Sequence, residues 1–290
     1  MINSHIHVGI IVVSYHNPEM TTNYVRRELP KLKTPYTLIV VNNDATEEES
    51  KALAHSCGIS FYEGKYISSK GCVICSKQNI GYAKGNILGV NILKSHGVKC
   101  SHYLFSNDDI EIKDNNILDE LCQSMALYGD CAGIGPRVIG LDGCDQSPHM
   151  RYISPIRQIG WKLFPFLRKK AKNKKTHQAI INDTKEVRTC YWVSGAYMLV
   201  DANKYMQVGG FDSRTFLYFE EAILAERFIK YGYRFYYAPS VSIVHFEGGS
   251  SKSINKKRIE EDSRMLYYKE YKNEPSFVIW LYHMMWKYVS

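Results

Sequence analysis

The run Val8-Gly9-Ile10-Ile11-Val12-Val13-Ser14 limits the possible folds of this chain more than any other segment. It is almost continuously apolar and rich in β-branched residues, which is typical of a strand buried on both faces of a parallel sheet. A helical segment from about Met20 to Leu29 separates it from a second apolar run, Tyr36 to Val41. Thr46 and the three glutamates after it then predict the start of another helix. This alternation predicts an α/β fold with a central, mostly parallel sheet flanked by helices.

Polar residues follow both of these predicted strands. Ser14 and Tyr15 end the first strand, and Asn42, Asn43 and Asp44 end the second. The carboxyl ends of parallel strands gather at one edge of a sheet, where open α/β sheets bind their ligands. We therefore expect these five residues to contribute to a nucleotide pocket.

Two adjacent acids end a third apolar run, in which Tyr103-Leu104-Phe105 leads into Ser106-Asn107-Asp108-Asp109. Neighbouring carboxylates in a partly dry crevice raise each other's pKa unless a cation holds them. Mg²⁺ or Mn²⁺ bridging to a diphosphate is the usual solution. The alternative interpretation is a polar turn, since Asp and Asn are common turn residues.

The segment Asn79-Ile80-Gly81-Tyr82-Ala83-Lys84-Gly85-Asn86 begins a predicted helix that runs to about Ser95. Its glycines permit close backbone approach, and a helix N-terminus offers free N–H groups to an anion. The spacing fits neither a Rossmann fingerprint nor a Walker loop. Tight packing of the helix on the sheet through Gly85 and Gly89 is therefore the alternative to anion binding.

The second half of the chain supplies three further candidates for a site. Gly195, within the predicted strand Tyr191–Val200, leaves room for a molecule to lie against the backbone. Glu220 and Glu221 begin a helix that ends at Gly232, where acids also serve simply to complement the helix dipole. His245 ends the strand Tyr233–Val244 and precedes a Gly-Ser loop, the setting of a mobile lid for a phosphate, although a purely structural histidine is the alternative.

The charge balance predicts acidic partners. The chain has 37 Lys and Arg against 29 Asp and Glu, a net charge of +8. Trp161–Leu167 is aromatic and precedes the basic block Arg168–Lys175, a combination suited to an anionic membrane surface, with a solvated loop as the alternative. The tail Phe277–Trp286 fits an interfacial anchor. No nucleic-acid motif accompanies the charge, so we expect no nucleic-acid partner.

Targeting and cysteine signals indicate a cytoplasmic protein. Met1–His7 lacks the basic segment and long apolar core of a signal peptide, and no apolar run approaches the roughly 20 residues of a membrane span. The eight cysteines are irregularly spaced, and Cys72 and Cys75 form a CxxC without a second pair. We therefore expect reduced thiols in a cytoplasmic protein, with a peripheral position on the inner face of the cytoplasmic membrane as a further hypothesis.

Taken together, these segments resemble family 2 glycosyltransferases of the GT-A fold, particularly the bacterial rhamnosyltransferase-like enzymes of surface polysaccharide synthesis. The resemblance runs in order from Val8 to Ser251. It implies a GT-A domain over residues 1–251 and a C-terminal helical extension over residues 252–290. The segments that carry it are Ser14-Tyr15, Val40–Asn43, Asn79–Asn86, Ser106–Asp109, Ser194–Ala196, Gly209–Asp212, Tyr218–Glu221 and His245 with its Gly-Ser loop.

The resemblance also implies roles for individual residues. Asp109, with Asp108 and His245, would hold a divalent metal, Mn²⁺ or Mg²⁺, on the donor diphosphate. Glu221 would be the general base, with Glu220 beside it. Trp192, Ser194 and Gly195 would bind the acceptor. The residues expected to bind the nucleotide sugar are Ser14, Tyr15, Asn42, Asn43, Asp44, Asn79, Gly81, Lys84, Asn86, Asn107 and Asp108.

Two departures from the family pattern leave points open. Asn42-Asn43 stands where these enzymes often have Val-Asp-Asn. Recognition of the nucleobase by a carboxylate is therefore replaced by amide contacts or moved to Asp44. Glu220-Glu221 replaces the usual Glu-Asp pair, which leaves the identity of the base open between the two. The chemistry itself needs a carboxylate to take a proton from the acceptor hydroxyl.

The expected activity is an inverting glycosyl transfer from a nucleotide-diphosphate sugar, either dTDP-rhamnose or a UDP-hexose. The expected acceptor is a hydroxyl of a saccharide linked to polyprenyl diphosphate, in the synthesis of O-antigen or capsule. The alternative is a non-catalytic module that binds a sugar nucleotide or a membrane surface. A nucleotidyltransferase fits less well, because no Gly-rich activating loop follows the first strand.

Overall fold

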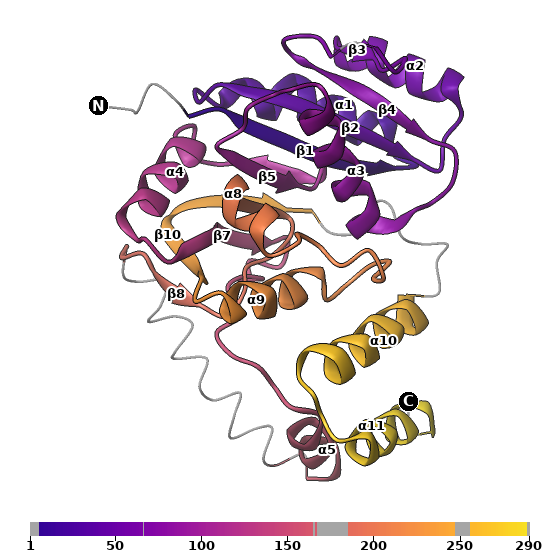
Figure 1. The fold of residues 1–290 in the computed structure, drawn as a ribbon, viewed down its shortest axis with the longest axis vertical. Coiled ribbons are helices and arrows are strands. Elements are labelled where there is room, and N and C mark those ends of the chain that lie inside the picture. The colour runs from indigo at the N-terminus through magenta and orange to yellow at the C-terminus, as the bar shows by residue number, and fades with distance from the viewer. Residues whose placement is uncertain (1–5, 66, 165, 167–184, 247–255, 289–290) are drawn as a thin grey trace.

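We describe the chain from a computed structural model, in which residues 6–65, 67–164, 166, 185–246 and 256–288 are placed. Their strands form one sheet (Figure 1), in the order β3-β4-β2-β1-β5-β9-β7-β10-β6, with β8 paired to β10. The strands are β1 (Val8–Tyr15), β2 (Tyr36–Asn43), β3 (Ser60–Phe61), β4 (Gly71–Ser76), β5 (His102–Ser106), β6 (Ile110–Ile112), β7 (Cys131–Gly140), β8 (Arg188–Cys190), β9 (Tyr197–Asp201) and β10 (Arg234–His245).

The strands of the N-terminal half pair in parallel, as the sequence predicts. β1 lies between β2 and β5, and β4 lies between β2 and β3. β7 and β10 are also parallel, whereas β9 runs antiparallel to β5 and β7, and β6 and β8 run antiparallel to β10. The mostly parallel α/β sheet flanked by helices is therefore confirmed.

Alternate residues of the central strands face opposite layers of helices. Ile10 and Val12 belong to a buried cluster with residues of η1 (Tyr24–Glu28), which directly follows α1 (Pro18–Asn23), and with residues of α2 (Glu47–Cys57) and α4 (Ile117–Leu127). Ile11 belongs to a second cluster with α3 (Gly81–Ser95), α8 (Ala202–Gln207) and α9 (Glu220–Lys230). Burial on both faces explains the continuous apolar run of β1.

Strand register places the polar strand ends side by side. Ser14 of β1 is opposite Asn42 of β2, and Tyr15 is opposite Asn43. Asn43 is in turn opposite Ser76 of β4, and Val12 is opposite Ser106 of β5. The carboxyl ends of four strands therefore meet at one edge of the sheet.

The structure corrects one prediction about local structure and contains two elements that the sequence pattern did not indicate. Gly71–Ser76 is strand β4, with Cys72 and Val73 fully buried. Tyr191–Ala196 is not part of a strand, because β9 begins only at Tyr197. Residues 140–190 lack clear periodicity in the sequence, yet they contain α5 (Pro155–Leu163), whose N-cap Ser154 accepts a hydrogen bond from the Arg157 N–H. The eight cysteines are all free thiols, as predicted.

The C-terminal segment is helical and packs against the rest of the chain. It comprises α10 (Lys256–Leu266), the π-helical turn η3 (Tyr267–Tyr271) and α11 (Ser276–Tyr288). Tyr268 and Tyr282 from this segment share a buried cluster with Ile159 of α5 and Ile223 of α9. Within the described residues, no helix is both long and apolar enough to cross a bilayer. The division at residue 251 stays a prediction, since it falls in a segment outside the described residues.

Candidate active site

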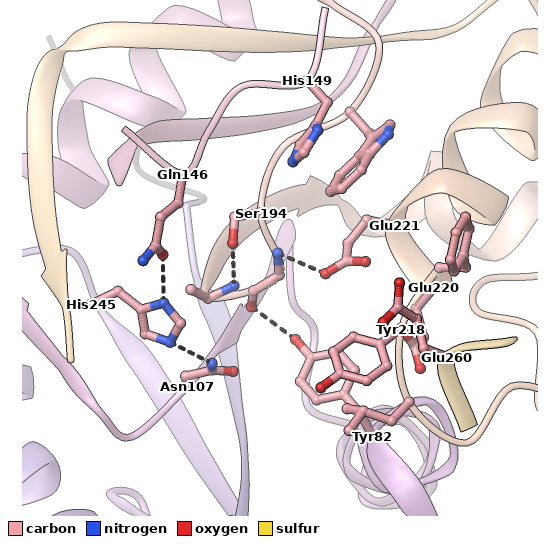
Figure 2. A pocket seen from close by; sticks show the side chains of 15 residues that line it. Tyr82, Asn107, Gln146, His149, Ser194, Tyr218, Glu220, Glu221, His245 and Glu260 are labelled. Carbon is pink, nitrogen blue, oxygen red and sulfur yellow. Dashed lines mark hydrogen bonds between the residues drawn. The ribbon is translucent and has the colours of Figure 1, made fainter. Parts of the chain in front are cut away.

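Two adjoining cavities open at the edge where the strands end. The glutamate cavity, of about 440 Å³, contains Glu220 and Glu221 in its wall (Figure 2). The aspartate cavity, of about 130 Å³, contains Asp108 and Asp109. The residues common to both walls are Tyr82, Asn107 and Leu217. A molecule that fills one cavity therefore comes into contact with the boundary of the other.

Glu221 is held at the mouth of α9 by the backbone of Gly195. The Gly195 N–H donates a hydrogen bond of 2.9 Å to Glu221 Oε1, and the Tyr82 hydroxyl donates one of 2.8 Å to the Gly195 carbonyl (Figure 2). A Cβ atom on residue 195 would lie 2.3 Å from Glu221 Oε1 and 3.0 Å from the Tyr82 hydroxyl. Only glycine therefore allows this carboxylate to approach the backbone so closely.

The chain enters α9 through two residues in left-handed conformation. Tyr218 has φ of 73° and Phe219 has φ of 70°, values that are costly for non-glycine residues. Both residues also line the glutamate cavity. Strained backbone of this kind concentrates at functional sites, and here it sets the direction in which Glu220 and Glu221 leave the helix.

The two glutamates differ in access to the cavity. Glu220 is only 1% exposed and its Oε1 has no hydrogen-bond partner, whereas Glu221 is half-buried. Burial raises the pKa of Glu220 well above its usual value, and the neighbouring Glu221 raises it further. Burial also raises the pKa of Glu221, while its hydrogen bond from Gly195 opposes that rise. Glu221 is thus the carboxylate better placed to contact a molecule in the cavity.

The two aspartates point to different partners. Asp108 Oδ2 accepts a hydrogen bond of 2.5 Å from the Thr21 hydroxyl of α1. Burial raises the pKa of Asp108 to about 6, while Thr21 lowers it and Asp109 raises it. Asp109 instead lies against the end of β10, with its Oδ1 3.1 Å from His245 Nε2. The structure therefore pairs His245 with Asp109 and not with Asp108.

The Asp109–His245 contact fits a divalent cation. His245 Nδ1 lies 2.7 Å from Gln146 Oε1, an acceptor, so the tautomer that satisfies this contact has its proton on Nδ1. Nε2 then accepts from the Asn107 amide at 3.1 Å and has no proton for Asp109, whose buried Oδ1 lacks a hydrogen-bond donor. Two acceptors 3.1 Å apart match neighbouring ligands of an octahedral ion with bonds of about 2.1 Å.

These two residues would not complete a metal site by themselves. In the part of the chain that the structure describes, no group of three or more His, Cys, Asp or Glu side chains could hold a metal ion. Mg²⁺ commonly takes one or two protein carboxylates and fills its other positions with water and substrate phosphates. The pair Asp109 and His245 is therefore consistent with a cation that a diphosphate helps to hold.

The predicted nucleotide-sugar residues divide into two groups. Those in the wall of the aspartate cavity are Tyr15, Asn43, Asn79, Gly81, Asn107 and Asp108. The others lie elsewhere: Ser14 bonds Thr21, Asn42 bonds Ser50, Asp44 pairs with His16, Asn86 bonds the Tyr82 carbonyl and Lys84 is exposed. Their predicted role in donor binding has no support from their position in the structure.

A network of amides shapes the floor of the aspartate cavity. Asn43 donates from Nδ2 to Asn79 Oδ1 at 2.8 Å, and its own Oδ1 accepts from the Ile80 N–H at 3.0 Å. Asn79 Oδ1 also accepts from the Gly81 N–H at 3.1 Å. These hydrogen bonds connect the first turn of α3 to the end of β2. The family resemblance implies that the nucleotide sugar binds at this place.

The predicted acceptor residues Trp192, Ser194 and Gly195 all line the glutamate cavity. Trp192 stacks on His149, with ring centroids 3.5 Å apart and planes 10° apart. Burial lowers the pKa of His149 to about 4, so this ring is neutral at physiological pH. The pair presents a flat, uncharged aromatic surface beside the two glutamates.

Sequence reasoning missed several residues of the glutamate cavity. Tyr82 stood within the Asn79–Asn86 segment, and its aromatic ring next to Gly81 was an available signal. No signal in the sequence marked the other three residues. Gln146 and His149 lie in a stretch without clear periodicity, and Glu260 belongs to the C-terminal helices. The predicted Gly-Ser lid at residues 248–251 lies outside the described residues.

Comparison with known proteins supports a glycosyltransferase relationship. No protein-family profile matches the chain. It is 27% identical over 150 residues to N-acetylglucosaminyl-diphospho-decaprenol L-rhamnosyltransferase of Mycobacterium tuberculosis, an alignment covering 51% of this chain and 48% of that protein. It is 22% identical over 261 residues to rhamnosyltransferase WbbL of Escherichia coli K12, covering 85% and 86% of the two chains. The alignment with the mycobacterial relative thus spans about half of that protein's length.

Two solved structures share the architecture. GalNAc-T7, determined with UDP, GalNAc and Mn²⁺, superposes with a TM-score of 0.60 at 12% identity, over 93% of this chain and 49% of that one. The mannosyltransferase PcManGT from Pyrobaculum calidifontis, in complex with GDP-Man and Mn²⁺, superposes with a TM-score of 0.58 at 11% identity, over 93% and 65%. The chain has the GT-A fold. The predicted resemblance to rhamnosyltransferase-like glycosyltransferases is also confirmed.

Proposed function

We propose that this protein is a metal-dependent, inverting glycosyltransferase. It moves a sugar from a nucleotide-diphosphate donor, dTDP-rhamnose or a UDP-hexose, to a hydroxyl of a saccharide acceptor in bacterial polysaccharide synthesis. The single observation that carries this proposal is the position of Glu221. Its carboxylate is fixed at 2.9 Å from the Gly195 N–H in the glutamate cavity, which adjoins the cavity that contains Asp109.

The cavities suit two substrates that meet at their shared wall. The diphosphate portion of the donor would lie at the aspartate cavity, near Asn43, Asn79 and the first turn of α3, with the rest of the nucleotide extending beyond it. The acceptor would occupy the glutamate cavity, with a sugar ring on the Trp192–His149 surface. The anomeric carbon would then lie near the boundary formed by Tyr82 and Asn107.

Glu221 supplies the general base in this arrangement. An acceptor hydroxyl must lose its proton as it attacks the anomeric carbon, and a carboxylate within hydrogen-bond reach accepts that proton. The Gly195 N–H and the mouth of α9 favour the ionised carboxylate, which a base requires. Glu220 is buried against the helix and has the higher barrier to ionisation, so it is assigned a supporting role. A single displacement of this kind inverts the anomeric centre.

Asp109 and His245 would hold the divalent cation, Mn²⁺ or Mg²⁺. When bound, such a cation neutralises the charge that develops on the leaving diphosphate. Gln146 orients the His245 ring through the contact at Nδ1, which leaves Nε2, 3.1 Å from both Asp109 Oδ1 and the Asn107 amide, as the ring atom available to a cation that displaces the amide contact. Partners of this kind fix a histidine ligand in its binding tautomer. Asp108 would act by holding the strand end through Thr21.

The proposed acceptor is a saccharide linked to polyprenyl diphosphate, and the proposed location is the inner face of the cytoplasmic membrane. The name of the mycobacterial relative refers to such a lipid-linked acceptor, N-acetylglucosaminyl-diphospho-decaprenol. The large glutamate cavity leaves space for an acceptor sugar but not for a polyprenyl chain as well. The lipid portion would therefore remain outside the protein, at a membrane.

The test is to incubate the protein and Mn²⁺ with a panel of nucleotide sugars and a polyprenyl-diphosphate-linked N-acetylglucosamine, and to measure release of nucleoside diphosphate. We expect release with one donor only in the presence of acceptor, and its loss in Glu221→Gln. If the protein binds a donor but transfers its sugar to no acceptor, and if Glu221→Gln changes neither donor binding nor release of nucleoside diphosphate, a non-catalytic binding module would be supported instead.

A further inference from the structure

Two helices that are far apart in sequence lie together at the end of the molecule farthest from β1 and β2 (Figure 1). α5 and α11 are joined by Lys162, whose Nζ donates to the Met285 carbonyl at 2.9 Å and lies 4.4 Å from the centre of the Trp286 ring. Ile159 and Tyr282 contribute to the same buried cluster beneath them. The two helices and residues 150–154 before α5 are called the helical tip below.

The helical tip exposes an unusual share of large apolar side chains. Phe277 is 68% exposed, Ile156 60%, Leu163 58% and Trp280 55%. Of fourteen exposed large hydrophobic residues in the described chain, six belong to the helical tip, and Phe164 and Phe166 come soon after α5. Exposed apolar side chains concentrated on two helices that touch each other indicate an interaction site, whereas scattered exposed hydrophobic residues are ordinary.

The sequence around α5 also contains the positive excess of the chain. Residues 146–182 include nine of the 37 Lys and Arg and none of the 29 Asp and Glu, so the remainder has 28 cations against 29 acids. Three of the nine, Arg151, Arg157 and Lys162, belong to the helical tip. α11 also has no acidic residue. The helical tip therefore combines cationic side chains with exposed apolar side chains.

We infer that the helical tip is the surface by which this protein docks on an anionic lipid bilayer. Cationic side chains approach lipid headgroups while Trp and Phe side chains enter the interface between headgroups and acyl chains. Nucleic acid would use the charge but would leave Phe277 and Trp280 uncovered. The pair Arg157 and Trp161, with the guanidinium 4.9 Å from the ring, has the amphipathic character of an interfacial anchor.

This surface is connected to the wall of the glutamate cavity. Glu260 of α10 lines that cavity, and α10 continues through η3 into α11. Tyr268 of η3 receives a hydrogen bond of 2.6 Å from the side chain of Gln158 in α5. A membrane at the helical tip would therefore lie on the same side of the protein as the C-terminal helices that border the proposed acceptor site. That functional link rests on the proposed function, but the docking itself does not.

The test is sedimentation of the full chain with vesicles of phosphatidylglycerol and phosphatidylcholine, compared with vesicles of phosphatidylcholine alone. Neither donor nor acceptor is added, so a failure of the proposed function would leave the result unchanged. We expect binding to the anionic vesicles that weakens as salt rises. Phe277→Ser/Trp280→Ser and Arg151→Gln/Arg157→Gln should each lower the partition coefficient about tenfold or more.

Matched control variants place the same changes elsewhere. Leu127→Ser/Ile229→Ser alters exposed apolar residues of α4 and α9, and Lys33→Gln/Lys99→Gln alters exposed lysines. Both controls should sediment like the unmodified protein, and all four variants should keep its melting temperature because the altered side chains are exposed. Equal sedimentation of helical-tip and control variants would overturn the inference. So would binding to single-stranded RNA in place of vesicles.

Discussion

The two cavities are built in different ways. The aspartate cavity lies at regular strand ends, where the register of β1, β2, β4 and β5 aligns polar residues at one edge. The glutamate cavity depends on irregular backbone, including the left-handed Tyr218 and Phe219, and on contacts between distant segments such as Gly195 with Glu221. Regular pairing is thus sufficient to assemble a binding surface, whereas a fixed carboxylate requires tertiary contacts that hold a particular side chain.

The largest effect is expected at the glutamate cavity. Glu221→Gln should slow transfer by on the order of 10² to 10⁴-fold, the usual contribution of a positioned general base. The amide retains the hydrogen bond from Gly195 but cannot take a proton. Steady-state release of nucleoside diphosphate measures this, with Glu220→Gln as the comparison on the same helix. A greater loss in Glu220→Gln would transfer the role of base to Glu220.

The next effect concerns the aspartate cavity. Asp109→Asn should weaken Mn²⁺-dependent donor binding by about 10²-fold or more, because it would remove the charged ligand that we propose for the cation. Little apolar area is lost, so the melting temperature should change little. Calorimetry with the nucleotide in the presence and absence of Mn²⁺ gives the measurement. Glu111→Gln, an exposed acid two residues along the chain, is the control and should bind normally.

A smaller loss is expected from Gly195→Ala, which would crowd Glu221 Oε1 at 2.3 Å. The carboxylate must then move, so turnover should fall by roughly 10 to 10²-fold through misplacement of the base. Donor affinity should remain normal, since Gly195 does not line the aspartate cavity. Gly160→Ala is the matched control, as its added Cβ meets nothing within 4 Å. Loss of donor affinity in Gly195→Ala would show that a change in the glutamate cavity alters binding in the aspartate cavity.

The smallest effect is on the pH dependence of stability. Because the pKa of Glu220 is raised in the folded state, the unfolded chain ionises first as pH rises above about 4.3. The folded state then binds more protons, so stability is lost as pH rises toward the raised pKa. Glu220→Gln removes this loss, and its melting temperature relative to the unmodified protein should increase with pH. A difference that is constant between pH 4 and pH 8 would contradict a buried, neutral Glu220.

Much of the aspartate cavity could be predicted from the sequence, because apolar runs define strands and polar residues after them mark one edge. Asp109 and His245 were expected to act together, and the structure places them 3.1 Å apart. The individual donor residues were less predictable. Ser14 and Asn42 follow the same pattern as Tyr15 and Asn43, yet their hydroxyl and amide face Thr21 and Ser50. Successive side chains along a strand point to opposite faces of the sheet. The sequence does not specify which of the two sets points toward the cavity.

The glutamate cavity was only partly predictable for a related reason. Glu221 and Gly195 were separate candidates, but nothing in the sequence shows that one accepts a hydrogen bond from the other across 26 positions. Gln146 and Glu260 come from segments with no motif. Gln146 is placed by its contact with His245, and Glu260 by the position of α10. Strand β4 was missed because a short run containing glycine and two cysteines lacks the β-branched continuity of β1.

The central claim is that donor binding and proton abstraction belong to separate cavities, and one calorimetric experiment tests it directly. Nucleoside diphosphate would be titrated, with Mn²⁺ present, into the unmodified protein, Asp109→Asn and Glu221→Gln at equal concentrations. The account predicts that Glu221→Gln binds with unchanged affinity although its turnover is lost, while Asp109→Asn loses affinity. Equal loss of affinity in both variants would contradict the division of the site into two cavities.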